Sequence, residues 1–442
     1  MSLPTLPAVE KLREALHIKA KGSPSFRFYT LYDKVYRADV LGTAYQRCRH
    51  NGGAAGVDRQ TFGDIEEYGL KHWLDELAEE LRKKRYRPQA VRRVWIPKPD
   101  GRQRPLGIPT IRDRVVQTAV MLVLEPIFEA DLQPEQHAYR PERSATQAIQ
   151  QVRSLLWQGR QEVIDADLSG YFDAIPHVEL MKSVARRVSD KQVLHLLKSW
   201  LVVPVEETDP RGRTHRTTRN QDTGRGTPQG APISPLLSNL SMRRFVVGWK
   251  ALGHEKRFRG KIVNYADDFV ICCPRGRAVA AMAAMRDMMA KLKLTVNEAK
   301  TRLCQLPVDT FDFLGYTFGR LWSRRTGNAY LGCRPSRKSR QRVRDRIHEL
   351  TSRNWLFLDV EEQVGRLNRL LNGWSNYFSV GTVEQDYSNL DQYVFHRLRR
   401  WYAAKHKERN RRTSRFTGSY AYDKLGLVRL TRRPRTDPCA QL

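Results

Sequence analysis

The chain has 442 residues with 78 Lys and Arg against 47 Asp and Glu, a formal net charge of +31. A charge of this size exceeds what solubility requires and indicates a polyanionic partner. The basic residues run along the whole length, which favours nucleic acid over the single amphipathic helix of a membrane-surface protein. No apolar run reaches membrane length and the six cysteines contain no Cys-x-x-Cys pair, so we expect a cytoplasmic protein with reduced thiols, without membrane or zinc.

The first hundred residues predict helices around one glycine-rich loop. Residues 1–25 read as a leader with little signal, and helical periodicity follows from Tyr29 to Arg49. The loop from Asn51 to Asp58 has three glycines, which either let the backbone approach a ligand or form a plain turn. A further helix is expected over about Gly63–Lys84.

A hairpin is predicted next, with Val91 to Ile96 alternating like a strand and Pro99-Asp100-Gly101 as the turn. Such a hairpin brings Lys98 and Arg104 toward one another. Two cations beside a turn suit a triphosphate, because Arg can fork onto two phosphate oxygens. The alternative is a pair of unrelated surface charges. A buried helix over Asp113–Glu129 follows, and Ser144 can cap another that runs to about Trp157.

Acidic residues follow a short strand over residues 163–167, before the chain turns at Gly170. Asp165 and Asp167 share a face of this strand, because strand side chains alternate. Asp167 is the candidate metal ligand, although an Asp in this position also serves commonly as a turn or cap residue. Further on, a polar, Arg-rich, hairpin-like insertion lies between Leu201 and Arg225, and the Gly226–Gly230 loop carries Gln229, whose amide suits a nucleotide pocket.

The stretch Asn264-Tyr265-Ala266-Asp267-Asp268 joins two apolar strands. Adjacent carboxylates repel one another unless a cation lies between them. Mg²⁺ prefers a few hard carboxylate oxygens, and two-metal phosphoryl transfer needs one more carboxylate beside such a turn. Together with Asp167, this turn predicts a metal site, and a solvated turn is the alternative.

From about Ser323 the composition becomes helical and basic. One helix carries four residues expected to bind RNA: Arg337, Lys338, Arg342 and Arg346. A second helix starts near Asp359 and a third covers about Asp386–Lys407. Aromatic residues among Arg and Lys suit RNA, where rings and guanidinium planes stack on unpaired bases. The competing interpretation, favoured for Trp374, places the aromatic residues in the core of the bundle.

Taken together, residues 26–405 resemble the group II intron-encoded reverse transcriptases, or maturases. The resemblance rests on six motifs in the order of that family: Ile96-Pro97-Lys98, Arg104 to Pro109, Asp167 with Phe172, Gly226 to Gly230 with Ser234-Pro235-Leu236, Tyr265 to Asp268, and Gly373 to Phe378. Departures occur in the Ala138-Tyr139-Arg140-Pro141 loop, which usually has Gly-Phe before Arg-Pro, and after the thumb, where no Cys/His endonuclease domain is recognised.

The resemblance implies an α+β right-hand polymerase. Its expected divisions are a leader (1–25), fingers (26–160), a palm with an antiparallel sheet (161–320), a helical thumb or maturase domain (321–407) and a basic C-terminal extension (408–442). Asp167, Asp267 and Asp268 would hold two Mg²⁺ ions, which Mn²⁺ could replace. Nucleotide contacts would come from Lys98, Arg104, Phe172, Gln229 and Lys300, with Phe172 excluding a ribose 2′-hydroxyl.

The implied function is RNA-directed DNA synthesis from dNTPs on a DNA primer, with binding of group II intron RNA that assists splicing and mobility. A bacterial, nucleoid- or ribonucleoprotein-associated protein is expected. Two alternatives stay open: a non-catalytic splicing maturase, and a domesticated reverse transcriptase used in host defence or repair.

Overall fold

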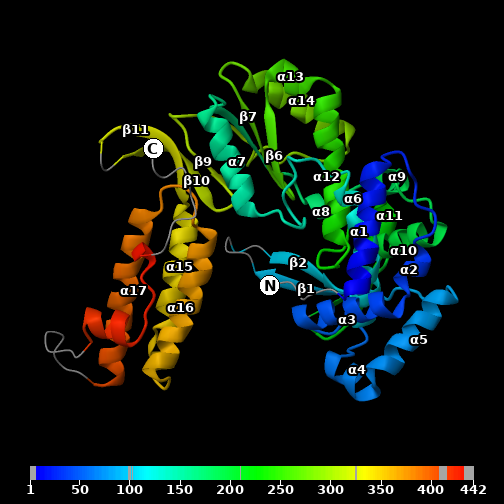
Figure 1. Cartoon of the computed structure of the whole chain (residues 1–442), viewed down its shortest axis with the longest axis horizontal. Coiled ribbons are helices and arrows are strands. Elements are labelled where there is room, and N and C mark those ends of the chain that lie inside the picture. Colours follow the sequence, from blue (N-terminus) through cyan, green and yellow to red (C-terminus); the bar gives the residue numbers. More distant parts are fainter. Residues whose placement is uncertain are drawn as a thin grey trace.

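The computed structural model describes residues 6–97, 101, 103–209, 211–323, 326–407 and 416–432. Figure 1 shows three helices, α15 (Arg337–Leu350), α16 (Val360–Tyr377) and α17 (Glu384–Lys405), on one side of the molecule and the N-terminal helices on the other. A mixed sheet-and-helix layer joins the two sides, and one hairpin lies between them. The α+β class expected from the sequence is confirmed. Within the described residues, no helix combines the length and apolar character needed to cross a membrane.

The N-terminal side is built around α6 (Ile111–Glu129), whose residues are apolar on nearly every face and are buried. α1 (Pro7–Gly22) packs on it, and the Arg13 guanidinium lies 2.6 Å from the Glu125 carboxylate. The segment expected as a featureless leader therefore contains a packed helix. The two long helices expected next are each divided, the second at Gly69, which has φ +103°. The resulting helices are α2 (Tyr32–Val35), α3 (Ala38–Asn51), α4 (Phe62–Tyr68) and α5 (Leu70–Arg82).

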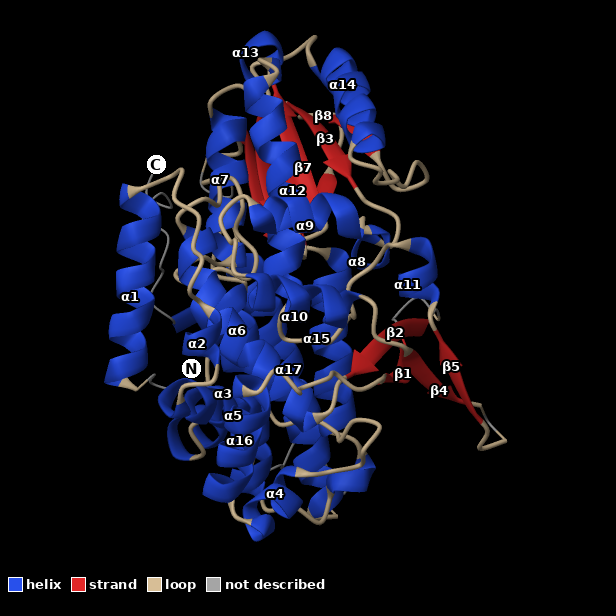
Figure 2. Ribbon diagram, turned by 90° about the vertical axis from the view of Figure 1, so that its right-hand side faces the viewer, coloured by secondary structure: helices blue, strands red, loops and turns tan. Residues whose placement is uncertain are grey.

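The predicted hairpin is present as β1 (Val91–Pro97) and β2 (Gln103–Ile108), paired antiparallel with Ile96 opposite Arg104. The insertion after α10 (Lys191–Leu201) forms a second hairpin, β4 (Val205–Thr208) and β5 (Thr214–Thr217), and β4 pairs in parallel with β1. Figure 2 shows the four strands as a separate sheet at the edge of the molecule. The expected division at residue 161 therefore does not follow the sheet, because strands from both sides of it pair.

The central sheet has the order β6-β7-β3-β8 and every pair in it is antiparallel. Its strands are β3 (Glu162–Ala166), β6 (Lys261–Tyr265), β7 (Asp268–Cys273) and β8 (Arg302–Gln305). α7 (Ala145–Trp157), capped by Ser144 as expected, contacts β6 and β7, and α14 (Ala278–Lys291) contacts β3, β7 and β8. Figure 2 shows helices flanking this sheet.

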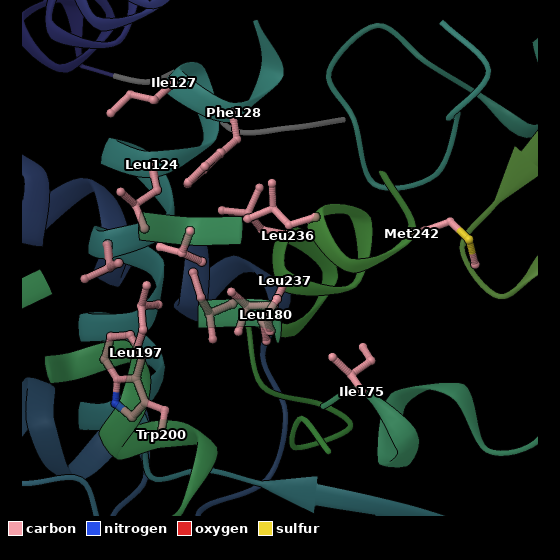
Figure 3. Close-up of a cluster of buried hydrophobic side chains, with 14 of the residues drawn as sticks. Leu124, Ile127, Phe128, Ile175, Leu180, Leu197, Trp200, Leu236, Leu237 and Met242 are labelled. Carbon is pink, nitrogen blue, oxygen red and sulfur yellow. The ribbon is translucent and has the colours of Figure 1, made fainter. Parts of the chain in front are cut away.

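A shared core fixes the sheet to the N-terminal helices. Figure 3 shows Leu124 and Phe128 of α6 near Leu180 of α9 (His177–Ala185), Trp200 of α10 and Leu237 of α12 (Ser234–Ala251). All five side chains are at most 1 % exposed. The same core includes buried side chains of β3, β6 and β7. Burial of large apolar side chains contributes about 1.5–3 kcal/mol each, so this core holds the central sheet against α6.

The helical domain is joined to the central layer by a small sheet of β9 (Phe311–Phe313), β10 (Tyr316–Trp322) and β11 (Ala329–Pro335). The Tyr316 hydroxyl donates to the Tyr377 carbonyl at 2.8 Å, and the Tyr377 hydroxyl donates to the Leu314 carbonyl at 2.9 Å. Part of the expected basic extension packs against the helical domain. Leu430 is buried, and its amide donates to Asp391 of α17 at 2.9 Å. Residues 416–432 therefore belong to the helical domain.

Candidate active site

A two-residue turn joins β6 to β7, with Tyr265 paired to Asp268 and the turn formed by Ala266 and Asp267. Ala266 has φ +59°, a left-handed conformation that costs a non-glycine residue about 1–2 kcal/mol. The buried Asn264 side chain offsets this cost by donating to the Ala266 carbonyl at 2.8 Å. The Asn264 backbone is held in turn by Glu135 and His137 at 2.8 and 2.9 Å. These hydrogen bonds of Asn264 fix the turn that carries the two carboxylates.

Asp167 lies beside this turn because of the sheet register. The last paired residues of β3 and β7 are Ala166 and Phe269, and continuing that antiparallel register brings Asp167 opposite Asp268. Although Asp268 keeps solvent contact, the walls of the site remove much of its water. This desolvation, with repulsion from Asp267, Asp167 and Asp165, raises the pKa of Asp268 to about 6. The three predicted carboxylates therefore form one electrostatic cluster.

Basic and amide groups hold the carboxylates of Asp165, in β3, and of Asp167, directly after it. The Lys300 ammonium lies 3.1 Å from Oδ2 of Asp167, and Asn297 Nδ2 donates to the same oxygen at 2.9 Å. Arg302 pairs with Asp165 at 3.2 Å. Lys300, which the resemblance assigns to a nucleotide phosphate, therefore contacts a carboxylate of the cluster in this structure.

The donor chemistry fits a divalent cation. Within the described ranges, no group of three or more His, Cys, Asp or Glu side chains already has the spacing of a complete metal site. The carboxylate oxygens are nevertheless the hard ligands that Mg²⁺ prefers. Desolvation raises the pKa of Asp268 most, and repulsion from Asp267, Asp167 and Asp165 raises it further, against the lowering effect of Lys300. A bound cation would relieve that repulsion.

The predicted nucleotide loop packs against β2. Arg104 Nε donates to Oε1 of Gln229 at 3.1 Å, and Gln229 Nε2 donates to Asp173 at 3.2 Å. The Gln229 carbonyl accepts from the Gly107 amide at 2.6 Å. A side chain at Gly230, which has φ +106°, would lie only 2.5 Å from the Gly107 carbonyl. Glycine is therefore required for this contact, which brings Arg104 and Gln229 together. Lys98 lies outside the described residues.

Phe172 lies in α8 (Tyr171–Ala174), next to the same loop. Its carbonyl accepts from the Thr227 amide at 2.8 Å, and its ring packs edge-to-face on Tyr171 at 5.7 Å. Only 8 % of Phe172 is exposed, so the ring is held firmly in place at the side of the nucleotide loop.

Several residues of the site were not predicted: Asn264, Asn297, Asp173 and Tyr139. Tyr139 has φ +55°. Desolvation raises its pKa, as does the charge of Asp267, whereas Arg104 lowers it. Tyr139 thus lies within electrostatic reach of both the carboxylates and Arg104. Its position in the loop that departs from the family pattern is the one signal the sequence offered.

The four predicted RNA-binding residues occupy two faces of α15. Lys338, Arg342 and Arg346 recur every four residues and form one exposed stripe, in which Arg346 also pairs with Glu349. Arg337 lies on the neighbouring face, where it lines a cavity together with Asp386 and Asn389 of α17.

Comparison with known proteins shows the family of this chain. Residues 96–318 match the family model described as "Reverse transcriptase (RNA-dependent DNA polymerase)", and residues 340–417 match "Group II intron, maturase-specific domain". Protein YkfC of Escherichia coli K12 is 31 % identical over 378 residues, covering 75 % of this chain and 94 % of that protein.

The group II intron-encoded protein LtrA of Lactococcus lactis subsp. cremoris is 32 % identical over 216 residues, covering 48 % of this chain and 34 % of that protein. A putative COX1/OXI3 intron 1 protein of Saccharomyces cerevisiae is 26 % identical over 329 residues, covering 63 % of this chain and 38 % of that protein. The chain thus spans nearly all of one relative and about a third of the other two. It belongs to the group II intron-type reverse transcriptases, a family of RNA-directed DNA polymerases that depend on divalent metal ions.

Proposed function

We propose that Asp167, Asp267 and Asp268 form a two-metal centre that adds dNTPs to a DNA primer on an RNA template. The observation that supports this most strongly is the sheet register, which brings Asp167 opposite Asp268 at the turn that also carries Asp267. When bound, the two cations would lower the pKa of the primer 3′-hydroxyl and neutralise the leaving pyrophosphate. The roles of the chain's own residues follow from their contacts.

Arg104 and Lys98 would bind the triphosphate, with Gln229 holding the Arg104 guanidinium at the pocket edge. Phe172, almost fully buried, would occupy the space of a ribose 2′-hydroxyl and so favour dNTPs. Lys300 would leave Asp167 as a cation binds there and pair instead with a nucleotide phosphate. This exchange keeps the charge of the site balanced with and without substrate.

We further infer that the helical domain binds intron RNA and assists splicing and mobility, with the α15 stripe of Lys338, Arg342 and Arg346 contacting the phosphate backbone. Fingers (26–160, joined by the β4–β5 hairpin), palm (to 320) and thumb (321–432) are the proposed divisions. A bacterial protein bound to ribonucleoprotein is the proposed setting.

Primer extension on an RNA template tests the chemistry. Asp267→Asn is expected to abolish extension while leaving RNA affinity within about twofold, because the substitution removes a metal ligand and little else. Full extension by the variant would refute the metal assignment. Splicing supported by the variant, with no extension by the wild type, would favour a non-catalytic maturase.

A further inference from the structure

A polar cavity lies within the helical domain, away from the carboxylate cluster. Its volume is about 270 Å³, and the helices α15, α16 and α17 form its walls. The exposed side chains of Arg337 and Arg344 border it, and Arg340, Trp374 and Asp386 line it more deeply. A single water needs only about 10–15 Å³, so the cavity has room for a larger group.

Two buried donors at this cavity have no acceptor. Arg340 Nε and Trp374 Nε1 are both inaccessible to solvent and make no hydrogen bond within the described residues. Leaving such a donor unsatisfied costs about 1–3 kcal/mol. Arg340 does pair with Asp386 through Nη1 at 3.2 Å, but this contact leaves Nε unsatisfied. Arg340 and Trp374 both line the cavity and are only partly buried, so an acceptor bound there satisfies both donors once these two side chains turn toward it.

The charge of the cavity indicates an anion. Arg337, Arg340 and Arg344 follow one another at three- and four-residue spacing, so all three lie on one face of α15. Like charges at this spacing destabilise a helix by about 0.2–0.5 kcal/mol per pair unless a counter-charge is near. Among the described residues that line the cavity, Asp386 is the one carboxylate, against three guanidinium groups. The positive excess, like the unsatisfied donors, favours a negatively charged acceptor.

We propose that this cavity binds a backbone phosphate of the RNA that the helical domain recognises, with Arg340 Nε and Trp374 Nε1 as its buried donors. The inference rests on the proposed RNA-binding function and adds a specific site to it. A phosphodiester supplies several acceptor oxygens and one negative charge, which match the two donors and the positive excess. The adjacent stripe of Lys338 and Arg342 would carry the same strand along α15.

The test compares two tryptophan variants of the full chain. Trp401 also has a buried indole N–H without a partner among the described residues, but it does not line the cavity, so Trp401→Phe is the matched control. Trp374→Phe keeps an aromatic ring against Phe378, 4.9 Å away, and removes the N–H donor, with the same loss of ring volume as in the control. We expect Trp374→Phe to weaken binding of a stem-loop RNA about three- to tenfold, and Trp401→Phe to leave the affinity unchanged.

Salt dependence separates this site from general charge attraction. Because Trp374→Phe removes no charge, the slope of log K against log salt should stay at its wild-type value, and Arg340→Lys should behave in the same way. Affinity equal to wild type in both variants would mean that the cavity holds water only. Primer extension by Asp267→Asn tests the polymerase proposal separately, so the failure of one proposal can be distinguished from the failure of the other.

Discussion

Neutralising Asp268 should stabilise the metal-free protein. Its pKa rises from 3.8 to about 6, so the ionised carboxylate opposes folding. At about 1.36 kcal/mol per pKa unit, two units give an upper bound of about 3 kcal/mol. Since Asp268 keeps solvent contact, screening reduces this figure, and we expect Asp268→Asn to gain about 1 kcal/mol.

The gain should depend on pH in one direction. Because the folded pKa lies above the unfolded value, the cost of the carboxylate is complete above about pH 6 and disappears as the pH falls toward 3.8. Urea unfolding in EDTA, followed by tryptophan fluorescence, should therefore separate Asp268→Asn from wild type at pH 8 and bring them together near pH 4.

Asp167→Asn is the matched comparison. Its carboxylate accepts from Lys300 and Asn297, so removing the charge also removes an ion pair, and no gain is expected. Millimolar Mg²⁺ should stabilise wild type more than either variant. Equal gains in the free energy of unfolding for both variants, or a gain for Asp268→Asn that persists at pH 4, would refute the explanation that the ionised Asp268 carboxylate destabilises the fold.

The remaining predictions concern the sugar contact and the thumb junction. Phe172→Ala should raise rNTP incorporation at least tenfold relative to dNTP incorporation, measured as a ratio of kcat/KM values, and an unchanged ratio would remove Phe172 from the sugar site. Gly381→Ala should cost about 2 kcal/mol or more in urea unfolding, because Gly381 has φ +82° and a side chain there would meet the Cys333 carbonyl. Gly373→Ala, in an open helical position, should instead raise the free energy of unfolding by about 0.5–1 kcal/mol. Similar effects of the two changes would contradict the contrast between a crowded and an open glycine.

Local patterns in the sequence were sufficient for most elements of the fold. Alternation and turn residues predicted the β6–β7 hairpin, and Ser144 predicted the start of α7, because short-range backbone preferences decide both. The parallel pairing of β4 with β1 was not predictable in this way. It joins residues more than 100 positions apart, and no local periodicity encodes that contact.

In the candidate site, too, the features set by local sequence were predictable and those set by long-range contacts were not. Asp167 and the Asp267-Asp268 pair were identifiable by residue type beside strands and turns. Asn264 was missed as the support of the turn, since an Asn in an apolar strand has no distinctive local signal and its role depends on Ala266 adopting a positive φ. The contact of Lys300 with Asp167 was missed for a different reason: it depends on how the loop after α14 packs against β3.

Locating manganese by anomalous diffraction, in crystals grown with primer, RNA template and dNTP, tests the central claim most directly. We expect anomalous peaks within coordination distance of the carboxylate oxygens of Asp167, Asp267 and Asp268, with Lys300 displaced from Asp167. Manganese bound elsewhere, with Lys300 still paired to Asp167 beside a bound nucleotide, would contradict it.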